Sequence, residues 1–377
     1  MSKSSLDIFD LKILKSEQNS RKDFLINKEK ELTFEEKEKI ALSRIKSFLK
    51  QCQSSNTEKP IIAFSGGKDS CVVRHLVHRI DPNIKSLTAA ELFHPEIAKF
   101  LKTIDDTTFV KPYRDFEWIV NNVGYPVLSK EVAEKINNVR TSKTLGNWTL
   151  ACFGLKKSRK IPKSKLHFLD ETLIDYKLTD KCCFYLKGKI KTNKTPQING
   201  TTVFESQLRR TNWLKNGCIF ESVYGLRCRP ISLWRDEDIW KYIKKYNIPY
   251  SKAYDMGWLR TGCIACGFGL SFEQKLSEKR IAKSRYELLY EHYPSLYKKY
   301  MYGKINMYKP LADAGIKINV PDERYQEYFN KRQRLIEEWY SDKNFLNNLN
   351  KILDQIENRT NTKIDQKTRS KIIKEYI

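Results

Sequence analysis

The sequence predicts an α/β fold with a mostly parallel sheet and with added helices at both ends of the chain. Short apolar runs suited to strands alternate with segments of helical periodicity. In chain order these elements are 61–64, 69–80, 84–89, 95–104, 107–110 and 116–123. Strands that alternate with helices at this spacing pair in parallel, because a parallel crossover needs about the length of a helix.

Length and composition fit a folded protein with a full core. The chain has 377 residues, of which 40% are hydrophobic and 31% charged, and this composition argues against a disordered chain. No apolar run is long enough to cross a bilayer, and the N-terminal residues lack the apolar segment of a signal peptide. We therefore expect a cytoplasmic protein with no membrane partner.

Helical and irregular segments surround the predicted sheet. Residues 34–49 have the stripe of an amphipathic helix, and 203–205 suit a further strand. Residues 236–246 predict a helix with Asp236 as its N-cap and an inward face. That face comprises Ile239, Trp240, Ile243 and Tyr246. The basic stretch 141–200 is interpreted as a helix-and-loop insertion over the sheet edge, and the chain from 271 onward is helical, basic and rich in tyrosine.

The charge balance favours a polyanionic partner. Lys and Arg number 70 against 45 for Asp and Glu, a formal net charge of +25. Such an excess suits nucleic acid, because neutralising phosphates releases bound counterions. A general lysine bias of the sequence is the alternative, since many lysines lie in dispersed helical patterns such as residues 35–50.

The segment Ser65-Gly66-Gly67-Lys68-Asp69-Ser70 lies between a predicted strand and a predicted helix. Glycines let backbone N–H groups approach an anion, the helix N-terminus adds a positive dipole end, and Lys68 adds a full charge. The serine hydroxyls are further donors. A plain tight turn would explain the glycines but not the lysine, aspartate and serines beside them. The segment does not follow the GxxxxGK[ST] pattern of P-loop enzymes.

This loop resembles the pyrophosphate loop of the ATP pyrophosphatases, the group that contains phosphoadenosine phosphosulfate (PAPS) reductases. Further segments between about 35 and 310 resemble the same family. They are His94–Ile97, Tyr125-Pro126 with Ser129–Glu131, Glu205-Ser206 with Arg209 and Arg210, and Pro230–Trp240. The sequence departs from the family where an acidic residue often ends the second strand; Ala89-Ala90 stands there, and Glu91 is a substitute.

The resemblance implies a Rossmann-like sheet of the adenine nucleotide alpha hydrolase type that binds ATP with Mg²⁺. It implies binding by the loop and by a second segment, with Lys68, Asp69 and Ser70 as catalytic residues. The binding residues are Ser65, Gly66, Gly67, Lys68, Asp69, Ser70, Glu205, Arg209 and Arg210. Three segments follow: a helical N-terminal segment 1–58, a PAPS reductase-like domain 59–270 and a basic helical region 271–377.

Nine cysteines in a cytoplasmic chain favour metal ligands or catalytic thiols over disulfides. Cys182-Cys183 and the CxxC pair Cys263 and Cys266 form the most distinctive group, because CxxC on a turn lets two thiolates converge on one metal. Buried thiols and a zinc clip are the alternatives. The pattern resembles the [4Fe–4S] signature of adenylylsulfate (APS) reductases and of the DNA phosphorothioation enzyme, and we expect these four residues to bind such a cluster, with glycines around the CxxC wrapping it.

The position of the cysteines also bears on the reaction. APS and PAPS reductases carry a catalytic cysteine near the C-terminus, whereas no cysteine follows Cys266 here. Cys71 could carry sulfur from the first turn of the helix after the loop, but a buried small residue is the expected role. The sequence favours an ATP-dependent sulfurtransferase that modifies nucleic acid, by DNA phosphorothioation or tRNA thiolation, with a cysteine desulfurase or another sulfur donor. The alternatives are an APS or PAPS reductase and a catalytically silent nucleotide-binding regulatory module.

Overall fold

The computed structural model describes residues 20–22, 32–54, 58–89, 92–155, 160–191, 194–278 and 283–377. The chain divides into two compact units, each built from two separate stretches. Unit 1 comprises Met1–Pro112 and Lys187–Asp255, and unit 2 comprises Tyr113–Leu186 and Met256–Ile377. Each unit therefore contains residues from both halves of the chain.

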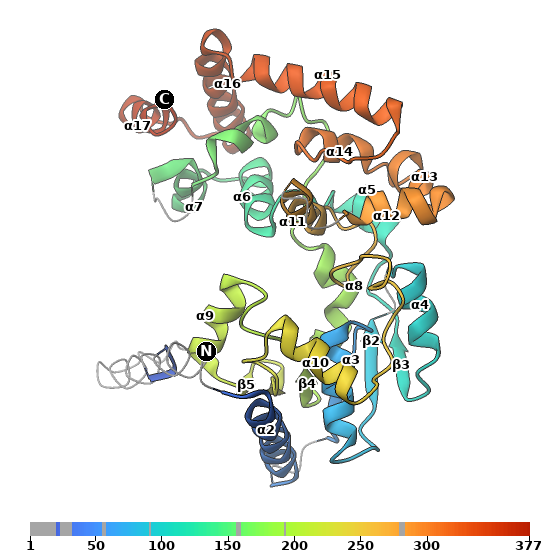
Figure 1. Ribbon diagram of the computed structural model, residues 1–377. Coiled ribbons are helices and arrows are strands. Elements are labelled where there is room, and N and C mark those ends of the chain that lie inside the picture. The colour runs from blue at the N-terminus through green and yellow to red at the C-terminus, as the bar shows by residue number, and fades with distance from the viewer. Residues whose placement is uncertain are drawn as a thin grey trace, which may run out of the picture. The chain divides into compact units, whose positions relative to one another are not determined.

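Unit 1 is built on a six-stranded sheet in the order β3-β2-β1-β4-β6-β5 (Figure 1). Every neighbouring pair is parallel except β5 and β6, which form an antiparallel hairpin. The strands are β1 (Ile61–Ala63), β2 (Ser86–Ala89), β3 (Thr107–Val110), β4 (Gln197–Asn199), β5 (Ile219–Ser222) and β6 (Gly225–Cys228). The α/β class predicted from the sequence is confirmed.

Four of the five helices of unit 1 were predicted from apolar stripes, and α9 was not. They are α2 (Phe34–Ser54), α3 (Lys68–His78), α4 (Pro95–Lys102), α9 (Gln207–Asn216) and α10 (Asp236–Lys245). The central helix α3 contacts β1, β4, α2 and α10, and its Val72, Val73 and Leu76 are fully buried. Burial of such side chains contributes roughly 1.5–3 kcal/mol each, so α3 is held firmly on the sheet.

One predicted strand of unit 1 is wrong. Residues 203–205 form a turn instead of a strand, because Val203 is buried against Trp213 and Leu233 and not in a ladder. Strands β4, β5 and β6 were not predicted. In β4 only Ile198 is apolar, so its burial between β1 and β6 could not be predicted from alternation.

The helix at 236–246 was predicted correctly, but its start and its face differ from the prediction. Its N-cap is Arg235, whose N–H donates to the Asp238 carboxylate at 2.8 Å, so Asp236 lies within the first turn. Tyr242 is fully buried, whereas Trp240 lies only half-buried on the flank.

Unit 2 is helical throughout its named elements. The elements before the CxxC pair are α5 (Phe116–Asn122), α6 (Lys130–Thr141), α7 (Asn147–Leu150), η1 (Ala151–Leu155) and the 3₁₀ helix η3 (Lys163–Leu169). Those after it are α11 (Gly267–Glu278), α12 (Arg285–His292), α13 (Pro294–Tyr302), α14 (Tyr308–Asp313), α15 (Glu323–Trp339), α16 (Asp342–Thr360) and α17 (Gln366–Lys374). Helix α8 (Cys182–Lys191) crosses the boundary between the units.

The predicted helical region from 271 onward is confirmed, and its tyrosines pack. Tyr286, Tyr297 and Tyr325 are among the largest fully buried side chains, so these tyrosines belong to the core. Among the described residues, no helix is both long and apolar enough to span a bilayer.

Candidate active site

The loop Ser65–Ser70 follows β1 directly and leads into α3. Phe64 prolongs the strand by one residue, because its N–H donates to Leu87 O at 2.8 Å. The two serines brace the turn: Ser70 Oγ donates to Gly67 O at 2.8 Å, and Ser65 Oγ accepts from Gly67 N at 3.3 Å. The loop therefore lies at the carboxyl end of a parallel strand and at a helix N-terminus, where α/β proteins bind anionic ligands.

Two glycines are required by this geometry. Gly66 has φ +71°, a left-handed conformation that strains other residues, and a Cβ there would lie 3.0 Å from the Leu101 side chain. Gly200, just after β4, approaches the loop so closely that a Cβ would lie 2.9 Å from Asp69 O. The sequence analysis missed Gly200, because the strand that it directly follows was not predicted.

Lys68 is buried and held by two carboxylates. Its Nζ lies 2.6 Å from Asp236 Oδ1 and 3.3 Å from Asp69 Oδ2, and its backbone N–H donates to Tyr254 Oη at 2.9 Å. Burial by itself lowers the pKa of Lys68, but the two carboxylates outweigh it and leave the pKa above its ordinary value. Lys68 is thus a fixed positive charge beside the loop.

The charge of Glu205 acts on the carboxyl group of Asp69. Burial raises the pKa of Asp69, Lys68 opposes that shift, and the negative charge of Glu205 adds to it. Glu205 accepts from Thr202 N at 3.0 Å and lies 3.8 Å from Arg209 Nε. Arg209 is exposed, and Arg210 next to it is half-buried.

The predicted loop and the predicted Glu205 segment therefore meet in unit 1. Asp69 and Glu205 suit Mg²⁺, which proteins bind through one or two carboxylates together with substrate phosphates. The loop supplies N–H groups and Lys68 for phosphates, and Arg209 has an exposed guanidinium for a further phosphate oxygen. The donor set fits a magnesium–nucleotide complex. Glu91, the substitute acid suggested by the sequence, lies outside the described residues.

All four cysteines of the predicted cluster belong to unit 2. Cys182 opens α8 and is buried, and Cys183 is half-buried. Cys263 is buried, and Cys266 forms a turn with it, since Cys266 N donates to Cys263 O at 3.1 Å. Among the described residues, however, no three His, Cys, Asp or Glu side chains lie close enough to hold a metal ion. As arranged in the structure, the four thiols do not fit a four-cysteine cluster.

A buried arginine stands beside the CxxC pair. Arg285 is 4% exposed, pairs with Glu273 and donates to the carbonyl oxygen of Cys263. Burial lowers the pKa of Arg285, but Glu273, Cys266 and Cys263 raise it further than burial lowers it. The sequence analysis missed this pair, in which Glu273 lies on α11 and Arg285 begins α12.

The glycines around the CxxC make room for neighbours. A Cβ on Gly267 would lie 2.6 Å from Pro126 O, and a Cβ on Gly269 would lie 2.4 Å from Arg285 Nη2. They were predicted to wrap a cluster; here they admit the Pro126 backbone and the Arg285 guanidinium. Cys71 is buried, and burial raises its pKa to about 12, so it is an inert core thiol, as the sequence indicated.

Comparisons with known proteins agree with the loop and the sheet. The family model of the phosphoadenosine phosphosulfate reductase domain matches residues 59–267, which is 209 of the 377 residues. Adenosine 5'-phosphosulfate reductases of Oceanobacillus iheyensis and Salinibacter ruber are 30% and 27% identical over 95 and 92 residues. Each match covers 23% of this chain and only 37% and 35% of the reductase, so the chain spans about a third of their length.

Two matches extend further along the chain. An uncharacterised protein of Methanocaldococcus jannaschii is 26% identical over 278 residues, which cover 71% of this chain and 56% of that protein. The solved phosphoadenylyl-sulfate (PAPS) reductase of Candida auris, a phosphate complex, is 12% identical and covers 70% of this chain and 98% of its own, with a TM-score of 0.35. That score is too low to support any argument. The match to the family model covers more than half of the sequence, so the chain belongs to the phosphoadenosine phosphosulfate reductase domain family.

Proposed function

We propose that this protein is an ATP-dependent sulfurtransferase that adenylates an oxygen of a nucleic acid and replaces it with sulfur. The observation that carries the proposal is the loop Ser65–Ser70 at the carboxyl end of β1, with a fixed cation at Lys68 and with Asp69 and Glu205 beside it. This arrangement supplies both a phosphate cradle and carboxylates for a magnesium ion.

The loop residues have different roles in binding ATP. Backbone N–H groups at the start of α3 and the ammonium of Lys68 neutralise the pyrophosphate portion. The phosphates replace Asp236 as the ion-pair partner of Lys68. The Asp236 side chain is 63% exposed, so its ion pair with Lys68 is weak. Ser65 and Ser70 keep the turn in shape. Mg²⁺, bound through Asp69 and Glu205, would offset the charge that develops on the leaving pyrophosphate.

The proposed reaction consists of two displacement steps. The acceptor oxygen attacks the α-phosphorus of ATP, a P–O bond forms, and the bond to pyrophosphate breaks. Sulfur at the sulfide level, delivered by a donor such as a cysteine desulfurase together with a reducing thiol, then attacks the activated centre and expels AMP. Lys68 holds positive charge where pyrophosphate leaves, and its raised pKa keeps it protonated throughout.

The positions of the cysteines favour sulfur transfer over reduction of a sulfonucleotide. A reductase needs a cysteine that attacks the sulfur of the sulfonucleotide, and no cysteine occurs between Cys266 and residue 377. Reduction stays the second candidate, because the similar curated proteins are adenosine 5'-phosphosulfate reductases. It predicts sulfite as the product, whereas transfer predicts pyrophosphate and AMP, and a silent regulatory module predicts neither.

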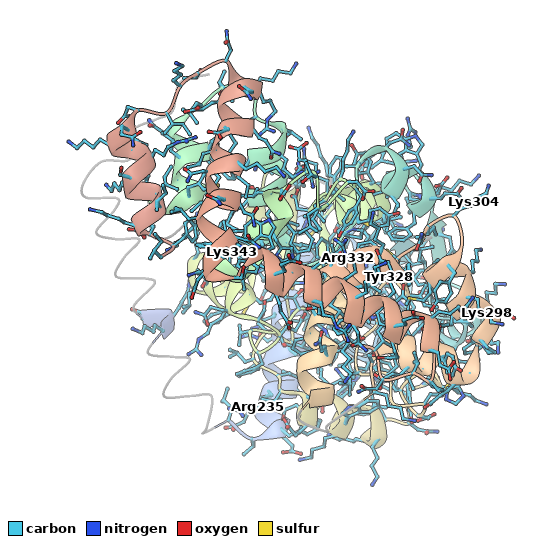
Figure 2. The ribbon with its side chains drawn as sticks, turned by 90° about the horizontal axis from the view of Figure 1, so that it is seen from above. Arg235, Lys298, Lys304, Tyr328, Arg332 and Lys343 are labelled. Carbon is cyan, nitrogen blue, oxygen red and sulfur yellow. The ribbon has the colours of Figure 1, made fainter. Side chains whose placement is uncertain are left out.

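A nucleic-acid acceptor is supported by the charge of the chain and by its distribution. Lys298, Lys331 and Lys343 are exposed and form no ion pair among the described residues. Figure 2 shows Lys298 and Lys343 on α13 and α16 of unit 2. Cations without protein partners are available to neutralise phosphates, and this contributes to the +25 net charge of the chain.

The test is pyrophosphate release from ATP in the presence of bulk tRNA, duplex DNA or no acceptor, with sulfide as the donor. We expect release that depends on one of the acceptors. Lys68→Ala should reduce release at least tenfold, as expected for the loss of a charged phosphate contact. Lys59→Ala, a change of an exposed lysine just before β1, is the matched control and should behave as wild type. Sulfite from a sulfonucleotide, without pyrophosphate from ATP, would replace this proposal with the reductase.

A further inference from the structure

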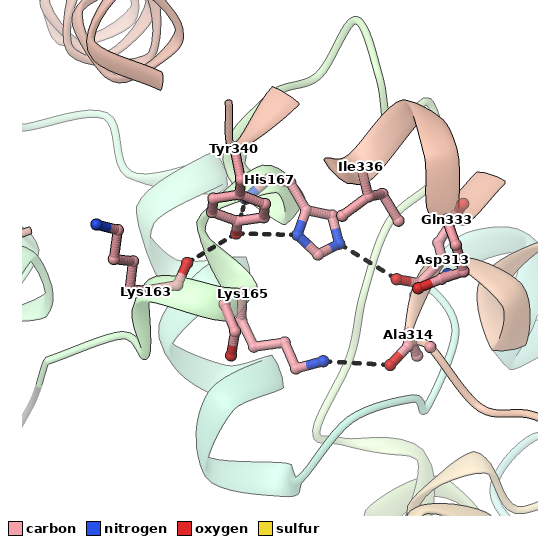
Figure 3. Close-up of a pocket in the computed structure, with 10 residues that line it drawn as sticks. Lys163, Lys165, His167, Asp313, Ala314, Gln333, Ile336 and Tyr340 are labelled. Atoms are coloured by element: carbon pink, nitrogen blue, oxygen red, sulfur yellow. Dashed lines mark hydrogen bonds between the residues drawn. The ribbon is translucent and has the colours of Figure 1, made fainter. Parts of the chain in front are cut away.

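A second candidate site lies in unit 2, far along the sequence from the phosphate loop. An open pocket of about 510 Å³ is lined by η3, by the turn after α14 and by residues of α15 (Figure 3). This volume falls in the range of small-molecule sites. Its lining combines two lysines of η3 with mostly apolar walls from the other two elements.

Lys165 is the distinctive group of the pocket. Its Nζ donates to Ala314 O at 3.2 Å, and the part of the chain that the structure describes provides no carboxylate partner for it. Figure 3 shows the side chain extended along the pocket toward Ala314. The pKa of Lys165 is lowered by burial, with no acid to offset it. An ammonium has three N–H groups, so two remain for a ligand.

His167 and Asp313, which also line the pocket, already have partners. His167 lies between Tyr340 Oη, at 3.1 Å from its Nδ1, and Asp313 O, at 3.2 Å from its Nε2. Burial lowers the pKa of His167 to about 4, so its ring is neutral at pH 7. The Asp313 carboxylate is paired with Arg332 and accepts from Tyr176 Oη at 3.0 Å. The charge left facing a ligand is therefore positive.

The walls next to Lys165 are apolar. Ile336 and Ala314 are buried side chains, and Tyr340, which follows α15, also lines the pocket. A fully hydrated ion would gain nothing from such walls, whereas an organic body would. We propose that this pocket binds a small organic anion, with a phosphate or carboxylate on Lys165 and an apolar or aromatic body against Ile336 and Tyr340.

Phenyl phosphate and benzoate are suitable probes, with benzyl alcohol as the neutral counterpart. Calorimetric titration of the full chain without ATP should detect binding of at least one anion and none of the alcohol at the same concentrations. Lys165→Gln should weaken the binding about tenfold or more, and Lys165→Arg should retain most of it. Lys298→Gln removes an exposed lysine outside the pocket and is the matched control. Equal affinity in wild type and Lys165→Gln, binding of the alcohol as tight as that of the anions, or no binding of either anion would overturn the proposal.

A second measurement uses the wild-type protein, so it tests the proposal even if the Lys165→Gln variant fails to fold. Reductive methylation of lysines, quantified by peptide mass spectrometry, should modify Lys165 more slowly when phenyl phosphate is present, while modification of Lys298 stays unchanged. Inorganic phosphate should protect Lys165 less than phenyl phosphate does, because it cannot use the apolar walls. Modification of Lys165 at the same rate with and without phenyl phosphate would also overturn the proposal.

Discussion

The buried pair of Glu273 and Arg285 gives the sharpest test of what holds the CxxC turn in place. The two side chains are 6% and 4% exposed, and Arg285 Nη2 lies 2.5 Å from Glu273 Oε1. Arg285 Nε lies 3.0 Å from both carboxylate oxygens, and Arg285 N donates to Glu273 Oε2 at 2.9 Å. Removing the carboxylate charge leaves a guanidinium that water cannot reach. Loss of one partner of a buried pair costs about 3–5 kcal/mol, so we expect Glu273→Gln to destabilise the protein by about 3 kcal/mol.

The matched control is Glu291→Gln, because Glu291 also pairs with a cation of unit 2, Lys283, at 2.5 Å. That pair is exposed, with side-chain exposures of 41% and 57%, so its loss should cost about 1 kcal/mol or less. Urea unfolding followed by far-UV circular dichroism measures both free energies. Replacing both buried partners, Glu273→Leu with Arg285→Met, should recover much of the lost stability. If Glu273→Gln is no worse than Glu291→Gln, Arg285 is not an isolated buried charge and the reasoning fails.

Three further outcomes are expected. Gly66→Ala should abolish most pyrophosphate release, because it forces a left-handed conformation and a 3.0 Å contact, whereas Gly146→Ala, with open space around it, should not. The pKa of His167 is lowered from 6.5 to about 4, so the unfolded chain binds a proton that the folded chain excludes. Stability should therefore fall as pH drops from 6.5 to 4, and less so in His167→Gln, as unfolding midpoints at pH 7 and 4.5 would show. Because the four thiols do not come together among the described residues, protein purified without oxygen should contain no four-iron cluster; about four irons per chain, lost in Cys263→Ser, would contradict this arrangement.

Local patterns predicted the sheet well where strands are apolar. The strand 107–110 is observed with the predicted bounds, and the loop after β1 was recognised because its glycines, lysine and serines stand between a strand and a helix. A short strand with one apolar residue, β4, carries no such signal, and its position depends on pairing with β1 and β6. Gly200 was missed with it, since its need for a small side chain arises only from contact with Asp69.

Long-range partners explain the rest of the difference. Asp236 lies 168 positions after Lys68 in the chain (236 minus 68), and nothing in either local sequence indicates that they pair at 2.6 Å. Arg285 likewise reaches Glu273 and the Cys263 carbonyl from a different helix. The four cysteines had a recognisable spacing, but spacing does not fix distance, and whether they bind one metal depends on packing that sequence patterns do not contain.

Two lysines of the chain illustrate how burial creates anion sites of different kinds. Burial disfavours the charged form of both lysines. The nearby carboxylates of Asp69 and Asp236 outweigh this effect and raise the pKa of Lys68. Among the described residues, no carboxylate offsets the effect at Lys165, so burial lowers its pKa. A ligand at Lys68 must compete with carboxylates already in place, so it needs several charges, as a triphosphate with magnesium has. A ligand at Lys165 competes only with a carbonyl oxygen, so a single negative charge is enough. On the two proposals made above, the same residue type would therefore select a polyphosphate in unit 1 and a small organic anion in unit 2, because the neighbours differ.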